Sequence, residues 1–230
     1  MLLLAVDSSG RQGSIALAEC GAGQSCAIIE IVALTGGTFS AELVLQIAAL
    51  LEKHGHTKND LDAFAVASGP GSFTGLRVGL AAIKALAEAL QKPIAAISLL
   101  KAVASSTAAP GRVFALLDAG RGDVYAGDYE FDPQIQSHWR MRSERLLSGD
   151  AFLVEAKGAN FRTVVTSDGA QAEAMHAAGI QVELIEQPNS GAIARLGWEH
   201  LQRAETVRPE DLEANYIRHS DAEIFAKPKA

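Results

Sequence analysis

Short apolar runs separated by turn residues open the chain and predict strands. Residues 2–6 form a continuous apolar run that ends at Asp7, and two further apolar segments, 13–17 and 26–34, follow glycine-containing turns. Runs of this length bounded by Gly and Ser fit buried strands. The pattern therefore predicts a meander of three strands at the start of the chain.

Two longer segments, 40–54 and 76–90, are apolar over nearly their whole circumference and predict unusual helices. A helix packed on one sheet needs an apolar stripe of only about 100°, so both helices have apolar surface left over. That surplus favours a helix-mediated contact with a partner or a second copy, with complete burial inside the chain as the alternative. The candidate contact residues are Leu43, Ile47, Leu50, Leu76, Leu80, Ile83 and Ala87.

The second half of the chain repeats the opening. Residues 107–111 are small, contain the turn-forming Pro110 and Gly111, and form the best boundary between two halves of the chain. Residues 113–125 then follow as strand, Asp118, glycine turn and strand, as residues 2–15 do around Asp7. The remaining pattern predicts strands at 63–67, 94–97, 136–142, 163–166 and 182–185 and helices at 99–106, 148–156, 171–178 and 190–203. We therefore expect an α/β protein of two similar halves, 1–107 and 112–230.

Composition narrows the classes of function. The 230 residues carry 20 Lys and Arg against 27 Asp and Glu, a formal net charge of −7. A phosphate backbone requires a basic footprint, so autonomous nucleic-acid binding is disfavoured. The chain has no apolar run of the roughly 18 residues that a membrane span needs, and we expect a cytoplasmic protein with no membrane contact. Cys20 and Cys26, which face each other if the hairpin forms, are expected to remain thiols in the core.

Candidate chemistry is confined to turns. A strand ending in Asp before a Ser/Gly turn, found at Asp7 and again at Asp118, is typical of the actin/hexokinase/Hsp70 type of ATP-binding fold, and plain hairpin turns are the alternative. Residues 68–75 are glycine-rich and lead into a helix, which fits either an anion cradle or a turn capped by Ser72 or Thr74. The weak cofactor-binding candidates are Asp7, Ser8, Gly71, Ser72 and Asp118.

Other catalytic sets are not predicted. His54 and His56 have a spacing that metal sites use, but no Cys or paired carboxylate lies in step, and a solvated loop is the alternative. The acidic residues Asp211, Glu213, Asp221 and Glu223 fit a solvated stretch near the C-terminus.

The segment Ser68-Gly-Pro-Gly-Ser-Phe-Thr-Gly-Leu-Arg-Val-Gly79 closely resembles the TsaB (YeaZ) family. Segments 4–9, 40–44, 118–125 and 212–218 agree with the same family, so the resemblance covers essentially the whole chain. It implies an actin-like, ribonuclease H-like (ASKHA) fold in which each half has a mixed sheet flanked by helices.

The resemblance also implies a non-catalytic partner. Proteins of this family pair with TsaD, which transfers a threonylcarbamoyl group to the adenosine beside the anticodon of certain tRNAs, and a small ATPase, TsaE, joins them. We accordingly expect a TsaD-like partner, a TsaE-like ATPase in the complex, a homodimer when alone, only indirect contact with tRNA, and no cofactor. Leu99 and Val103 stand where TsaD-like proteins carry metal-binding histidines, and aliphatic side chains cannot bind a metal. The rival functions are a small actin-fold ATPase or kinase and a peptidase M22-like metallopeptidase.

Overall fold

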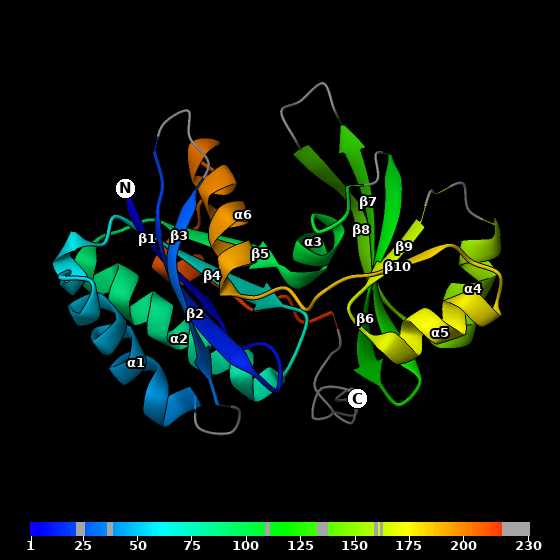
Figure 1. Cartoon of the computed structure of the whole chain (residues 1–230), viewed down its shortest axis with the longest axis horizontal. Helices are drawn as coiled ribbons and strands as arrows, with labels where there is room; N and C mark the ends of the chain where they lie inside the picture. Colours follow the sequence, from blue (N-terminus) through cyan, green and yellow to red (C-terminus); the bar gives the residue numbers. More distant parts are fainter. Residues whose placement is uncertain are drawn as a thin grey trace, which may run out of the picture.

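Two five-stranded sheets lie side by side in the computed structural model, each with helices on its faces (Figure 1). The structure describes residues 1–21, 26–35, 39–108, 111–132, 138–158, 161 and 163–217. Arg218, Asp221 and Glu223 lie outside these ranges. No helix in the described ranges is long and apolar enough to cross a membrane.

The elements follow the order that the sequence predicts. The first half contains β1 (Leu2–Asp7), β2 (Gly13–Glu19), β3 (Ala27–Leu34), α1 (Phe39–Lys53), β4 (Ala63–Gly69), α2 (Phe73–Leu90), β5 (Ile94–Ser98) and α3 (Leu99–Ala104). The second half contains β6 (Arg112–Gly120), β7 (Asp123–Asp132), β8 (His138–Ser148), α4 (Gly149–Gly158), β9 (Thr163–Thr166), α5 (Gly169–Ala177), β10 (Val182–Leu184) and α6 (Ser190–Gln202). Two short 3₁₀ helices, η1 (Lys58–Asp60) and η2 (Pro209–Asp211), complete the set.

The two sheets have the same topology, which confirms the predicted repeat. The first has the strand order β3-β2-β1-β4-β5, and the second has β8-β7-β6-β9-β10. In each sheet the first three strands are antiparallel and the last two join in parallel. Strands β1 and β4 are buried along their whole length, because helices cover both faces of the first sheet, and this explains their unbroken apolar sequence.

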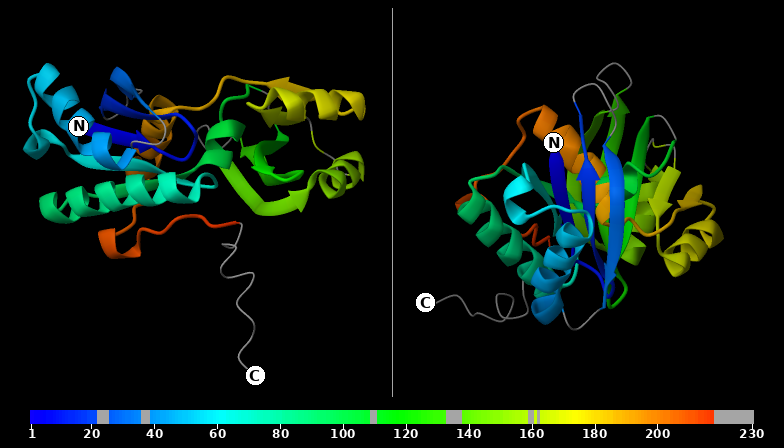
Figure 2. Two further views of the ribbon diagram at one scale, coloured as in Figure 1. Left: turned by 90° about the horizontal axis from the view of Figure 1, so that it is seen from below. Right: turned by 60° about the vertical axis from the view of Figure 1, so that its left-hand side comes forward.

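Each half contributes its last helix to the other half. Helices α1 and α2 cover one face of the first sheet, and the opposite face is covered by α6, which comes from the end of the second half (Figures 1 and 2). Conversely, α3 packs mainly on β6 and β7 of the second sheet, whose other face carries α4 and α5. The division into residues 1–107 and 112–230 stays a prediction, and α3 and α6 each pack on the sheet of the other half.

The state of the cysteines differs from the expectation of free thiols. Cys20 and Cys26 form a disulfide. The β2–β3 hairpin brings their Cα atoms to 4.2 Å, since they follow β2 and precede β3 directly. The expected facing across the hairpin is therefore confirmed, and the expected thiol state is wrong because the hairpin places the two sulfur atoms within bonding distance.

Candidate functional site

The turn after β1 is docked against the glycine-rich loop before α2. The backbone N–H of Ser72 donates to the carbonyl oxygen of Ser9 over 2.7 Å, and the hydroxyl of Ser8 donates to the carbonyl oxygen of Gly75 over 2.8 Å. The hydroxyl of Ser72 accepts from the N–H of Gly75 and so caps α2. Two segments that the sequence offers as separate phosphate loops are thus bonded to each other.

Glycines make this docking possible. A Cβ atom at Gly71 would lie 2.5 Å from the carbonyl oxygen of Ser9, and one at Gly75 would lie 2.0 Å from that of Ser8. One turn later, a Cβ at Gly79 would meet the Ser8 hydroxyl at 2.3 Å. These distances are below any real contact of a Cβ, so the glycine spacing of the motif serves the close approach of α2 to the turn. The cap at Ser72 and the close approach at Gly71 agree with the turn-and-cap alternative for residues 68–75, and cofactor binding by Ser8, Gly71 and Ser72 stays a prediction.

A cavity of about 1060 Å³ opens beside this junction. The turn between β1 and β2 and the N-terminal ends of α1, α2 and α6 all contribute to its wall. Its lining combines small polar residues with an apolar side: Asp7, Gly10, Arg11, Gln12, Gly13, Ser14, Ile31, Ala33, Leu34, Thr35, Phe39, Ser40, Ser72, Thr74, Gly75, Val78, Gln187, Pro188 and Asn189. Of the five cofactor-binding candidates, only Asp7 and Ser72 line it.

The two predicted aspartates have different environments. Asp7 is 5% exposed, and its Oδ1 accepts from the N–H and hydroxyl of Ser9. Burial raises the pKa of Asp7, and the bonds from Ser9 oppose that rise. Asp118 is exposed, accepts from the N–H of Gly120 in its own turn, and does not line the cavity. The structure thus does not bring the pair together in this cavity.

The seven residues predicted to contact a partner are all buried inside this chain. They belong to the core between the first sheet, α1 and α2, with exposed fractions of 0% to 7%. Contact through these seven side chains does not fit their burial, because the sheet and the neighbouring helix already cover them. The same helices present another apolar face to solvent: on α1, Val44 is 59% and Leu45 70% exposed, and on α2 the exposed alanines are Ala81, Ala85 and Ala89.

An exposed cluster at the start of α2 was not singled out by the sequence. The Arg77 guanidinium lies 3.7 Å from the ring centroid of Phe73, and its Nε donates to the Tyr216 hydroxyl over 3.1 Å. The rings of Phe73 and Tyr216 are 5.2 Å apart. Phe73 and Arg77 are one turn apart on a helix, a spacing that could have paired them. Tyr216 lies 139 residues beyond Arg77, and no local pattern connects them.

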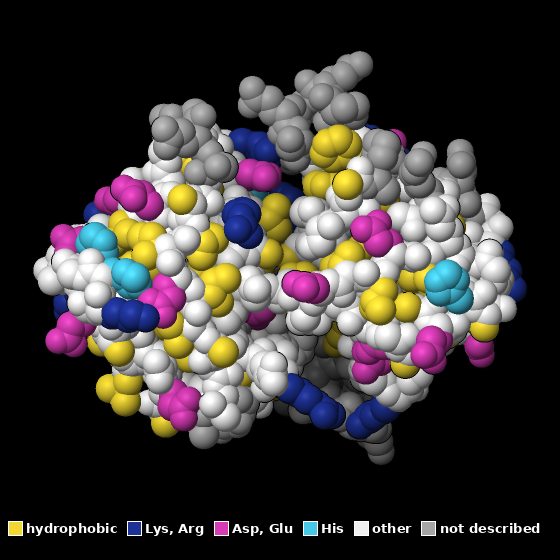
Figure 3. Space-filling model, viewed as in Figure 1, with side chains coloured by type: hydrophobic (Ala, Val, Ile, Leu, Met, Phe, Trp, Pro, Cys, Tyr) yellow, Lys and Arg dark blue, Asp and Glu magenta, His cyan; other side chains and the backbone are white. Residues whose placement is uncertain are grey.

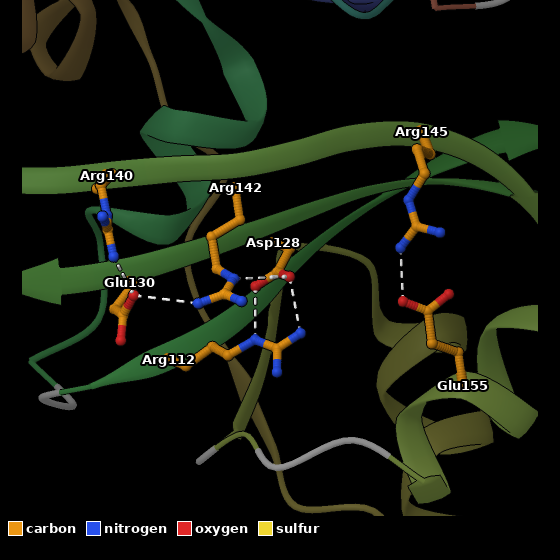
Figure 4. Close-up of polar contacts among 7 residues, drawn as sticks. All are labelled: Arg112, Asp128, Glu130, Arg140, Arg142, Arg145 and Glu155. Carbon is orange, nitrogen blue, oxygen red and sulfur yellow. Dashed lines mark hydrogen bonds and ion pairs between the residues drawn. The ribbon is translucent and has the colours of Figure 1, made fainter.

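Arginines and carboxylates alternate on the second sheet (Figure 4). Asp128 binds Arg112 in a bidentate pair at 2.8 Å and lies 3.6 Å from Arg142. Glu130 binds Arg140 at 2.7 Å, and this hydrogen bond holds the pKa of Glu130 below its ordinary value. Glu155 of α4 binds Arg145 of β8. Each of these four guanidinium groups already has a carboxylate partner within the chain.

His54, Leu99 and Val103 also have defined places in the structure. His54 contacts Glu30 at 2.7 Å at the end of α1. Leu99 and Val103 on α3 are buried at 3% and 0% exposure. In the described ranges no group of three or more His, Cys, Asp or Glu side chains is arranged to hold a metal ion.

Comparison with known sequences gives one family profile and several relatives. The profile of TsaD, a tRNA N6-adenosine threonylcarbamoyltransferase, matches residues 34–139. A Bacillus subtilis protein named tRNA threonylcarbamoyladenosine biosynthesis protein TsaB is 33% identical over 132 residues, or 57% of this chain and 56% of the relative. The Escherichia coli protein of the same name is 29% identical over the same shares. The chain thus spans about half the length of the curated relatives it matches.

Comparison with solved structures covers nearly the whole chain. A Pseudomonas aeruginosa protein described as similar to peptidase YEAZ is 27% identical, with a TM-score of 0.76 over 94% of this chain and 99% of the other. YeaZ from the same organism is 25% identical, with a TM-score of 0.71 over 93% and 100%. Together with the paired mixed sheets, these likenesses establish the actin-like, ribonuclease H-like fold.

Proposed function

Because this chain belongs to the TsaB/YeaZ family, we propose that it is a non-catalytic subunit of the machinery that forms threonylcarbamoyladenosine in tRNA. Its partner is a TsaD-like threonylcarbamoyltransferase, to which the matching profile of residues 34–139 relates it as a paralogue. The names of the relatives support the pathway, and the exposed surface and the residue chemistry of this chain support the role within it.

The exposed face of α1 and α2 is the proposed contact surface. Leu45 is 70% exposed and Val44 59% exposed, next to one another on α1. This pair is the observation that carries the proposal, since adjacent large aliphatic side chains on a helix gain most from being covered by a partner. The exposed alanines of α2 add apolar area without bulk, so a partner helix can approach closely. Figure 3 shows hydrophobic side chains among the polar surface of the first half.

The non-catalytic role is supported by residue chemistry. By the family resemblance, Leu99 and Val103 stand where TsaD-like proteins carry metal-binding histidines, and in this structure both are aliphatic core residues of α3. The turn after β1 is bonded to the glycine-rich loop before α2, by Ser8 to Gly75 and by Ser72 to Ser9, and the second turn of an ATPase, at Asp118, does not line the same cavity. These features favour a structural subunit over the ATPase and metallopeptidase alternatives.

Other partners follow from the same proposal. A TsaE-like ATPase joins the complex through the pair, and a second copy of the chain occupies the α1–α2 face when the transferase is absent. The formal net charge of −7 leaves most of the tRNA contact to other subunits. We expect the purified chain to carry no cofactor.

The test is capture by the TsaD-family protein encoded in the same genome, measured by isothermal titration calorimetry. Leu45→Glu should weaken binding by about 2 kcal/mol or more, because it places a charge in the apolar contact. Val154→Glu is the matched control, since Val154 is 75% exposed on α4 of the second half, and it should bind as the wild type does. Equal binding by both variants would rule out the α1–α2 face, and failure of the wild-type chain to bind would reject the pairing.

A further inference from the structure

Arg77 is held in place with its terminal nitrogens unused. Its guanidinium stacks on Phe73 at 3.7 Å and its Nε donates to Tyr216. Within the described ranges these are the contacts of the Arg77 side chain, and both terminal Nη groups are without a hydrogen-bond or ion-pair partner. A guanidinium fork presents parallel donors that match a carboxylate or phosphate in a bidentate pair. By contrast, the arginines in Figure 4 already have acidic partners.

The aromatic side of this cluster is fixed by a segment that we call the strap, residues 212–217. The N–H of Asn215 donates to the carbonyl oxygen of Ser68 over 2.7 Å, and its Nδ2 donates to Glu144 of β8 over 2.6 Å. Glu144 also accepts from Ser98 and Tyr129. The strap is therefore bonded to both halves directly beside Tyr216, and a side chain held in this way loses little entropy when a partner binds.

The cluster has the composition of an interaction hot spot. Phe73 and Tyr216 are each 40% exposed, and Arg77, which contacts both, is exposed as well. Arginine and aromatic residues dominate the binding energy of protein interfaces, especially where they are already ordered before binding. The cluster also begins the same helix, α2, whose exposed alanines lie on the proposed partner surface.

We propose that Arg77 is the charged anchor of the partner interface and takes a carboxylate of the protein partner in a bidentate pair, with Phe73 and Tyr216 packing around it. The inference rests on the proposed function and adds the chemistry that the partner must present: an Asp or Glu flanked by apolar side chains. The strap makes Arg77 selective, because it fixes the direction of the fork.

Charge favours a single carboxylate over an RNA backbone. Residues 208–217 contain three acidic residues, Glu210, Asp211 and Glu213, against Arg208. Lys84 on α2 donates to the carbonyl oxygen of Glu210, which places η2 along the same helix. Arg208 already pairs with Glu210 and Asp211, so a polyanion following these described residues would meet three carboxylates against one paired arginine, whereas one carboxylate needs only the fork of Arg77.

The experiment measures binding of three variants to the TsaD-family protein of the same genome and, separately, to bulk tRNA. Arg77→Glu should weaken protein binding about 30-fold or more, as loss of a hot-spot arginine does. Arg77→Lys keeps the charge but loses the fork, and a loss of about 5-fold is expected. Tyr216→Phe keeps the ring stack and loses the hydrogen bond to Nε, so a smaller loss is expected. Arg140→Gln, on the exposed edge strand β8, is the control and should bind as the wild type does.

Each outcome decides the inference. A loss for Arg77→Glu with unchanged circular dichroism, together with normal binding by Arg140→Gln, supports it. Wild-type binding that Arg77→Glu leaves unchanged overturns the anchor and leaves the proposed pairing standing. Failure of the wild-type chain to bind overturns both. A loss seen with tRNA alone and not with the protein overturns the carboxylate partner in favour of RNA.

Discussion

The two halves share one topology and differ in what they do with it. In the first half, α1 and α2 run for 15 and 18 residues and bury their faces against a sheet that α6 covers from behind. The corresponding helices of the second half, α4 and α5, have 10 and 9 residues. The edge strands differ too: β3 exposes Ile29 and Ile31, whereas β8 presents paired arginines.

This contrast separates architecture from surface chemistry. Both halves have the same strand order, so the strand order does not determine which residues each half exposes on its surface. The first half places its two most exposed large aliphatic side chains next to one another on α1, which suits contact with another protein, whereas the exposed Met141, Val154 and Leu184 of the second half lie on three separate elements. The second half arranges charges as internal pairs across β6, β7 and β8, and the charged side chains of β8 protect this edge strand from unwanted pairing. The following substitutions test how far the halves differ.

The largest expected effect comes from placing a charge in the core of the first half. Ile83 on α2 is 0% exposed, so Ile83→Glu should cost about 4 kcal/mol or more of unfolding free energy. Ala85→Glu changes an exposed position two residues later and should stay within about 0.5 kcal/mol of the wild type. Urea denaturation measures both. Similar stabilities for the two variants would contradict the assigned face of α2.

The next effect tests the exchange of helices. A Cβ at Gly197 of α6 would lie 2.4 Å from the Cβ of Ala65 on β4. Gly197→Leu should therefore push α6 from the first sheet and cost about 3 kcal/mol. Thermal unfolding is the measurement, and near-native stability would mean that α6 does not lie against β4.

A smaller effect compares glycines at the start of corresponding helices. Gly75→Ala places a methyl group 2.0 Å from the carbonyl oxygen of Ser8, whereas a Cβ at Gly169 of α5 meets nothing within 4 Å. Gly75→Ala should cost about 2 kcal/mol in spite of the better helix propensity of Ala. Gly169→Ala should be neutral or slightly stabilising. The two midpoints in urea give the comparison, and equal midpoints would show that the β1 turn does not need this glycine.

The smallest effect concerns the two aspartates. The pKa of Asp7 is raised by burial, so the folded state holds its proton more tightly than the unfolded state. Its contribution to stability is therefore present below about pH 3.8, the unperturbed value, and is lost as the pH rises through the raised folded value. Asp7→Asn should therefore be more stable than the wild type, and this difference in unfolding free energy should grow from pH 4 to pH 7.

The control for this prediction is the exposed counterpart. Asp118→Asn changes a solvated turn and should leave the unfolding free energy within about 0.5 kcal/mol. Denaturation at both pH values measures each difference. A gain for Asp7→Asn that is larger at pH 4 than at pH 7 would have the opposite sign to that expected from burial.

Local patterns predicted the elements, their order and the repeat, because strand and helix periodicities and turn residues act over a few positions. They also located the glycine-rich loop and offered Ser72 or Thr74 as its cap, and Ser72 is the cap in the structure. They did not predict which face of α1 and α2 would remain open, because burial of Leu43 or Leu80 depends on what the far sides of the sheet and helices contact. The seven expected contact residues recur at helical spacing, so they share the faces that pack into the core, whereas the equally apolar Leu45 is 70% exposed.

Long-range arrangements lay outside the reach of the pattern for the same reason. Two contacts join residues that are far apart in sequence: the packing of α6 on the first sheet and the hydrogen bond from Arg77 to Tyr216. The different locations of Asp7 and Asp118 likewise depend on how distant segments fold. A close approach between two elements does require a small residue, which the sequence shows, and Gly197 packed on Ala65 is an example. A small residue alone does not identify the element that packs against it.

The exchanged helix also has a consequence for synthesis. Residues 190–202 supply the cover for a sheet whose strands all lie before residue 99. While a ribosome makes the intervening segment, one face of the nascent first sheet has no cover from its own chain. The cover of this face therefore forms only after α6 has been made, although the sheet itself is translated first, and until then the apolar face is open to aggregation.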